Sequence, residues 1–258
     1  MKPLSALPSS SIKAVFSDLD DTLTEKGQLN SATLQGLERL AMRNIWLVIV
    51  SGRPAGWADA LMRLFPLDAV IFENGAGMMV REKDRIRTEL LAKDIDFGKQ
   101  KKILEETFKK IKTEIPKAKL ATDQRYRLCD YAVDFNEEPP FLNDAQVDKV
   151  MAIVKKNPKL TAKLSSIHVN YWYGNHTKVS ACEHLIAKFG KAHGVTKKNI
   201  VFSGDSPNDE PLFAYFPNSV GVANVRRFLP KMKAKPKFIA QNPGGTGFLE
   251  IVKRLTGA

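Results

Sequence analysis

The chain has 258 residues, 43% hydrophobic and 26% charged, which is the balance of a folded globular protein and excludes a disordered one. Its apolar runs are strand-sized, as at 45–50, and residues 1–11 lack the pattern of a secretory signal, so we expect a cytoplasmic protein with no membrane partner. The formal charge of +12 favours anionic ligands, and the two cysteines, Cys129 and Cys182, are expected to be free thiols.

The first 80 residues alternate strand and helix patterns. Buried strands are predicted at 14–17, 45–50 and 69–72, and helices at 31–43 and 56–65. This alternation is typical of an α/β fold with a parallel sheet covered by helices.

From Gly77 the pattern changes to a hairpin and then to two rounds of a helix with paired strands. The expected helices are 97–114 and 143–156, and the expected strands are 119–122, 131–135, 160–164 and 168–173. Strand and helix alternation returns with a helix at 179–193, strands at 200–203, 220–222 and 238–240, and a helix at 247–255. We therefore predict a Rossmann-like parallel-sheet core of residues 1–80 and 174–258, with an inserted α+β domain of residues 81–173.

Polar residues follow several predicted strands of the core. These elements are Asp18-Leu19-Asp20-Asp21-Thr22, Ser51-Gly52-Arg53, Lys178 at a helix start, and Gly204-Asp205-Ser206-Pro207-Asn208-Asp209. Because ligands of open α/β sheets bind at the carboxyl ends of the strands, we expect these elements to form one site. Asp18 and Asp20, two residues apart, can converge there, and Mg²⁺ is the cation expected to relieve their repulsion. A calcium loop of the EF-hand type is excluded, since Leu23 and Leu29 would replace its glycine and glutamate.

As a set and in this order, the four elements resemble the motifs of the haloacid dehalogenase (HAD) superfamily of aspartate-nucleophile phosphatases. The resemblance covers roughly residues 10–80 and 174–258. Since the α+β insert falls between the second and third motifs, the chain is similar to subclass IIB, which contains the Cof-type, sucrose-phosphate and trehalose-phosphate phosphatases and the eukaryotic phosphomannomutases. The insert would then be a cap domain that closes over the site and recognises the leaving group.

The resemblance implies a role for each motif residue. Asp18 would be the nucleophile that forms an aspartyl-phosphate, and Asp20 the general acid and base. The phosphate-binding groups would be Ser51, Gly52, Lys178 and Asn208. The Mg²⁺ ligands would be Asp18, the backbone carbonyl of Asp20, Asp205 and Asp209. Asp21 stands where the family usually has glycine, and we expect it to be solvated or structural.

Substrate selection depends on residues outside the motifs. The candidates are Arg53, Asn74, Arg125, His168, Tyr171, Tyr173 and Asn175. Aromatic and amide groups suit a sugar ring, and arginine suits a second anionic group. The alternation along 168–173 fits a half-buried strand as well, and the sequence leaves open whether Arg53 faces the substrate or pairs with an acid.

We therefore predict a Mg²⁺-dependent phosphatase that acts on a small phosphorylated metabolite, with sugar and polyol phosphates as the first class. A phosphomannomutase-like sugar phosphomutase is the alternative, disfavoured by the compact loop at 204–209. A nonenzymatic nucleic-acid-binding protein that uses the basic run at 226–237 is less favoured, because the catalytic motif set is intact and that run fits a solvated face. The sequence does not distinguish a monomer from a homodimer.

Overall fold

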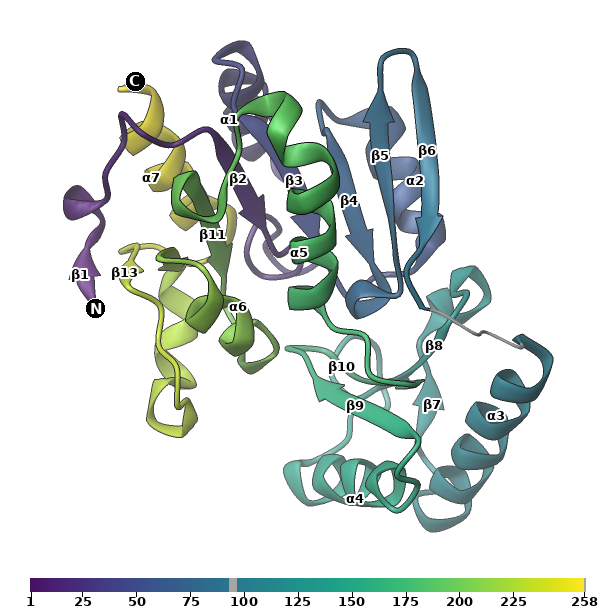
Figure 1. Ribbon diagram of the computed structural model, residues 1–258. Helices are drawn as coiled ribbons and strands as arrows, with labels where there is room; N and C mark the ends of the chain where they lie inside the picture. The colour runs from purple at the N-terminus through teal and green to yellow at the C-terminus, as the bar shows by residue number, and fades with distance from the viewer. Residues whose placement is uncertain (93–96, 258) are drawn as a thin grey trace.

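The computed structural model describes residues 1–92 and 97–257, whose strands form a large and a small sheet (Figure 1). The large sheet contains, in spatial order, β1 (Lys2–Pro3), β13 (Phe238–Ile239), β12 (Asn218–Gly221), β11 (Ile200–Gly204), β2 (Ala14–Ser17), β3 (Trp46–Val50), β4 (Ala69–Phe72), β5 (Gly77–Glu82) and β6 (Arg85–Leu90). The strands from β1 to β4 are parallel, and the hairpin β5–β6 continues the sheet in antiparallel pairing.

Helices cover both faces of the large sheet. One face is covered by α1 (Ser31–Met42), α2 (Ala55–Leu64) and α7 (Gly244–Thr256), and the other by α5 (Lys178–Phe189) and α6 (Glu210–Tyr215). Alternate residues of β2 contact the helices on both faces. Val15 packs in the hydrophobic cluster under α1, α2 and α7, and Phe16 packs in the cluster under α5 and α6. Because this strand is buried on both sides, its sequence reads as a continuous apolar run that ends where the polar motif begins.

The small sheet is antiparallel, in the order β7 (Lys119–Leu120), β8 (Asp130–Asp134), β10 (His168–Tyr173) and β9 (Leu160–Leu164). Helices α3 (Phe97–Glu114) and α4 (Asp144–Lys155) pack on one face of it, against residues that include Val133, Val169 and Tyr171. The alternate residues of β10, namely His168, Asn170 and Trp172, therefore lie on the opposite face of the sheet.

The strongly periodic segments form where the sequence predicts them, and β2, β4, β9, β10 and α3 match to the residue. The hairpin differs, because its first strand, β5, pairs with β4 and its second, β6, pairs with β5, so residues 81–90 belong to the sheet of the core and not to the inserted sheet. Helix α7 begins at Gly244 and not at 247, and α5 ends at Phe189, followed by a 3₁₀ turn at Gly190–His193. The two-residue β1 and the six-residue α6 were not predicted, because such short elements show no period.

Among the described residues, no helix combines the length and the apolar content that crossing a membrane requires.

Candidate active site

The predicted polar elements lie at the carboxyl edge of the large sheet. Asp18 directly follows β2, and its backbone N–H donates to Ser203 O of β11 at 2.9 Å, so the pairing of the sheet fixes where the aspartate begins. Ser51 follows β3 in the same way and donates its N–H to Ile71 O of β4 at 2.9 Å. Asp205 follows β11, which completes the convergence that the topology predicts.

Lys178 contacts acidic residues from two of these elements. Its Nζ lies 2.7 Å from Asp18 Oδ1 and 3.0 Å from Asp209 Oδ1, and the side chain is buried. Thr177 caps the N-terminus of α5, which sets the position of the lysine in the first turn of the helix. Burial opposes the charge of the ammonium, but the attraction of Asp18 and Asp209 outweighs it and raises the pKa of Lys178, which stays protonated.

Gly75 explains how α5 comes so close to the edge of the sheet. Its φ is +101°, and a Cβ at this position would lie 2.2 Å from Thr177 O. Only glycine permits this backbone to touch the residue before Lys178, so the Glu73-Asn74-Gly75 turn helps to place the lysine.

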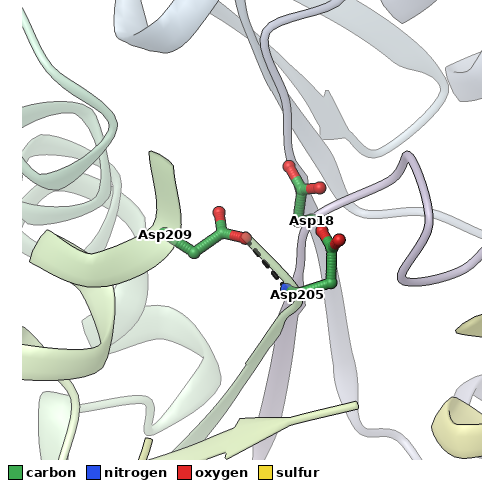
Figure 2. Close-up of side chains that lie close together, drawn as sticks. All are labelled: Asp18, Asp205 and Asp209. Carbon is green, nitrogen blue, oxygen red and sulfur yellow. Dashed lines mark hydrogen bonds between the residues drawn. The ribbon is translucent and has the colours of Figure 1, made fainter. Parts of the chain in front are cut away.

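Asp18, Asp205 and Asp209 form a cluster of buried carboxylates, shown in Figure 2, whose oxygens lie within 4.8 Å of one another. Burial and the charges of Asp209 and Asp20 raise the pKa of Asp18 to about 8, although Lys178 opposes the shift. Burial and the neighbouring carboxylates also raise the pKa of Asp205. A set of hard oxygen ligands with more negative charge than one lysine can balance fits a divalent cation such as Mg²⁺.

The loop that carries Asp205 and Asp209 is held by hydrogen bonds of its own. Asp209 Oδ2 accepts from the backbone N–H groups of Asp205 at 3.1 Å and Ser206 at 3.3 Å. The carboxylate packs directly on Gly204, where an added Cβ would lie 2.6 Å from Asp209 Oδ2. Asn224, which follows β12 and was not predicted, donates to Asp205 Oδ2 at 3.1 Å and to Asp21 O at 2.8 Å. Thus Asp209 and Asn224 orient Asp205, and Asp21 has a structural role through its backbone carbonyl.

The carboxylate of Asp20 turns away from this cluster toward Arg53. Arg53 Nη2 lies 2.8 Å from Asp20 Oδ1, and Nε is 3.0 Å from Asp20 Oδ2. The same guanidinium reaches Glu137 at 2.6 Å and Asp123 at 3.2 Å, both in the inserted domain. Of the two roles left open by the sequence, Arg53 therefore takes the pairing with acids in this structure.

Two further contacts hold the inserted domain against the core. Arg127 Nη1 donates to Gly52 O at 2.9 Å, directly behind the predicted phosphate loop. Glu73, fully buried, accepts from the backbone N–H groups of Leu128 at 2.9 Å, Cys129 and Asp130, as well as from Ala55 N at 3.0 Å. Burial and the charge of Asp130 raise the pKa of Glu73 to about 7, against the opposing effect of these donors.

A cavity of about 10 Å³ remains between the two parts of the chain. Asp18, Asp20 and Asn208 line it from the core, and His168 and Asn170 line it from the inserted domain. Since a water molecule needs about 10–15 Å³, the structure is that of a closed site.

Comparison with known proteins agrees with this geometry. The family model of sucrose-6F-phosphate phosphohydrolase matches residues 12–255, which is almost the whole chain. The chain belongs to this family. It is accordingly a phosphatase of the HAD superfamily and a phosphoric monoester hydrolase.

Similar proteins match almost the whole length of this phosphatase. A phosphoglycolate phosphatase from Methanothrix thermoacetophila is 25% identical to this chain over an alignment of 258 residues. The alignment covers 96% of this chain and 98% of the relative. A solved structure from Thermoplasma acidophilum has a TM-score of 0.74 and 17% identity, over 95% of this chain and 98% of its own. The sucrose-phosphatase of Synechocystis sp., solved with sucrose and phosphate, has a TM-score of 0.63 and 17% identity, over 94% of this chain and 97% of its own. These structures support the HAD fold.

The substrate candidates of the phosphatase fall into two groups. His168 lines the closed cavity, and Asn74 lies beside Gly52, whose added Cβ would be 3.1 Å from Asn74 Nδ2. Tyr171 corrects the prediction, since its hydroxyl donates to Leu104 O at 3.0 Å on the helix-covered side of the inserted sheet. Tyr173 packs against the same cluster, and Arg125 and Asn175 are exposed and do not line the cavity at Asp18. The alternation along β10 was real, but its tyrosines occupy the face that α3 and α4 cover.

Proposed function

We propose that this phosphatase requires Mg²⁺ and hydrolyses a small phosphorylated metabolite through an aspartyl-phosphate intermediate. The observation that carries the proposal is the buried contact of Lys178 with Asp18 at 2.7 Å, beside two further carboxylates at the end of parallel strands. Burial and the neighbouring carboxylates raise the pKa of Asp18 to about 8, so Lys178 alone does not keep Asp18 ionised at neutral pH. A divalent cation held by the same carboxylates would lower this pKa and, together with Lys178, would leave Asp18 ionised as the nucleophile.

The carboxylates of Asp18, Asp205 and Asp209, with the carbonyl of Asp20, would hold the metal. Bound there, Mg²⁺ would neutralise negative charge on the phosphoryl group and on the nucleophile. Lys178, Ser51, Asn208 and the backbone N–H of Gly52 would bind the phosphoryl oxygens, which share the charge that develops in the transition state.

The chemistry of the chain's own residues runs in two steps. In the first, an oxygen of Asp18 bonds to phosphorus while the ester bond breaks, and Asp20 gives its proton to the departing oxygen. In the second, Asp20 takes a proton from water as the water oxygen bonds to phosphorus and the bond to Asp18 breaks. Arg53 holds Asp20 at the boundary with the inserted domain.

Sugar and polyol phosphates are the first class of substrate we propose. The family name and the sucrose-phosphatase structure support a sugar phosphate, and the phosphoglycolate phosphatase supports a still smaller ester. His168 and Asn170 at the closed cavity can donate to and accept from hydroxyl groups.

The test is hydrolysis of p-nitrophenyl phosphate by Asp18→Asn and, as the matched control, Asp21→Asn. The amide of the first variant cannot form the acyl phosphate, so we expect a loss of at least about 10³-fold in kcat/KM, with an unchanged circular dichroism spectrum. The control makes the same chemical change three residues away, outside the carboxylate cluster, and should keep most of the activity.

Chelation by EDTA should abolish activity, and added Mg²⁺ should restore it. Activity of Asp18→Asn near the wild-type level would rule out the nucleophile.

A further inference from the structure

A second cavity adjoins the closed site. It has a volume of about 220 Å³ and shares Asn208 with the smaller cavity at Asp18 and Asp20. Asn74 and Lys178 line it from the core, and Lys163 and Trp172 line it from the inserted domain. It is thus a space next to the reacting groups, bounded by both parts of the chain.

The strand register explains why two residues of the inserted sheet reach this cavity. Lys163 of β9 stands opposite Asn170 of β10, and Trp172 lies two residues further along β10. These residues share the face of the sheet that carries His168, whereas Val169 and Tyr171 pack under the helices. Lys163 and Trp172 therefore belong to the face that looks onto the catalytic edge.

Two buried N–H donors of this cavity have no acceptor in the described part of the chain. Trp172 Nε1 and Asn74 Nδ2 are buried and have no hydrogen-bond partner within residues 1–92 and 97–257. Lys163 forms no ion pair in this part of the chain, and none of the described residues that line the cavity is Asp or Glu. An indole N–H and an ammonium can only donate, so the complementary ligand must present acceptor oxygens, preferably charged ones.

The opposite side of the site differs in charge. There the guanidinium of Arg53 already contacts Asp20, Asp123 and Glu137. A second anionic group placed on that side would meet three carboxylates, whereas one placed near Lys163 would meet a cation without an acidic partner. Electrostatics thus direct an anionic end of the substrate to the second cavity.

We propose that this cavity receives the leaving group and selects one that carries a carboxylate, bound by Lys163 and by the N–H of Trp172. The proposal rests on the proposed phosphatase function and narrows its substrate to phosphate esters of small hydroxy acids, including sugar acids. The volume fits this class, because about 220 Å³ is below the roughly 300–1,000 Å³ of pockets for larger ligands.

The experiment compares two esters that differ in one group. Phosphoglycolate and 2-hydroxyethyl phosphate have the same two-carbon chain, ending in a carboxylate or in an alcohol. We expect wild-type kcat/KM to favour phosphoglycolate by at least about tenfold, as expected for one charge-assisted contact. Lys163→Met should remove most of this preference and leave kcat/KM for 2-hydroxyethyl phosphate and p-nitrophenyl phosphate within about twofold.

Two further variants separate charge, hydrogen bonding and folding. Trp172→Phe keeps an aromatic ring and removes the N–H, and it should lower kcat/KM for phosphoglycolate about three- to tenfold without affecting the alcohol ester. Lys155→Met removes an exposed lysine of α4 and should leave the preference intact. Equal kcat/KM for the two esters in the wild type, or an equal loss for both in Lys163→Met, would overturn the carboxylate proposal. Failure of the wild type to hydrolyse p-nitrophenyl phosphate with Mg²⁺ would instead overturn the proposed function.

Discussion

At the scale of single residues, the site depends on one buried cation. Lys178 is 5% exposed and contacts Asp18 and Asp209, so it balances charge that water cannot reach. Breaking a buried ion pair from one side leaves the other charge without a partner, which is more costly than the loss of an exposed pair. Stability and activity therefore depend on the same ammonium group.

Lys178→Met should lower the free energy of unfolding by about 3–5 kcal/mol and abolish turnover. Urea unfolding at pH 7 without divalent metal measures the first effect. Lys188→Met is the matched control on the same helix, because Lys188 is 36% exposed and its 2.6 Å contact with Glu89 is worth less than about 1 kcal/mol. Similar small losses in both variants would contradict a structural role for the buried lysine.

His176 gives the protein a specific pH dependence. It is stacked on Trp172 with ring centroids 5.2 Å apart, and burial lowers its pKa from 6.5 to about 4. Between pH 6.5 and pH 4, His176 is protonated in the unfolded chain but stays neutral in the folded protein. The free energy of unfolding should therefore fall as the pH falls toward 4. The effect is on the order of 3 kcal/mol at most.

Urea unfolding at pH 7.5 and pH 4.5 measures this slope. His176→Gln has no titrating ring and should lose less stability between these pH values than the wild type. A variant that follows the wild-type profile would show that His176 titrates normally in the folded protein.

At the scale of elements, the inserted sheet is fastened to the core through the turn after β4. Glu73 accepts from three consecutive backbone N–H groups at the start of β8, and Arg127, just before them, donates to Gly52 O. The contact joins backbone of the inserted domain to the loop beside the nucleophile. This contact therefore ties the position of the inserted domain to that of the loop at Gly52.

Glu73→Gln should weaken this contact, since an amide replaces one acceptor oxygen by a donor that faces backbone N–H groups. The expected cost is about 1–3 kcal/mol. Cys129 lies at this contact, so its thiol should react with a disulfide reagent about tenfold faster in the variant. Cys182, fully buried in the core, is the internal control and should keep its rate. An unchanged rate at Cys129 would show that the contact does not hold the domain closed.

The sequence predicted the elements that have a strong period and the site residues that directly follow them. Asp18, Ser51 and Asp205 could be placed because chain order and a parallel sheet determine which edge each residue reaches. Glu73, Glu137 and Arg127 could not be placed, because their partners depend on how the inserted domain docks. Strand alternation places Tyr171 and Trp172 on opposite faces, but it does not say which face the helices cover, so the prediction included Tyr171 and Tyr173, which pack under α3 and α4.

At the scale of the molecule, the basic run at 226–237 presents its lysines to solvent, and the aromatic rings in and beside it are partly or fully buried. Lys231, Lys233, Lys235 and Lys237 are exposed, whereas Met232, Pro236 and Phe238 between them are buried. Phe228 is half-buried beneath Arg227, at 4.5 Å. This arrangement is typical of a solvated rim around a folded core.

We therefore expect only weak, salt-sensitive binding of single-stranded RNA, with Kd above about 1 μM near 0.15 M salt. Fluorescence anisotropy with a labelled oligonucleotide measures it. Replacing the four exposed lysines by glutamine should leave phosphatase activity unchanged. Tight binding that disappears in that variant would establish a nucleic-acid surface.

The cavity of about 10 Å³ at Asp18 has a kinetic consequence. No phosphate ester fits a space of that size, so the inserted domain must move relative to the core before a substrate can bind at Asp18. The rate of opening is then an upper limit on kcat, and mutations that tighten the contacts of Glu73 or Arg53 would make a more stable but slower enzyme.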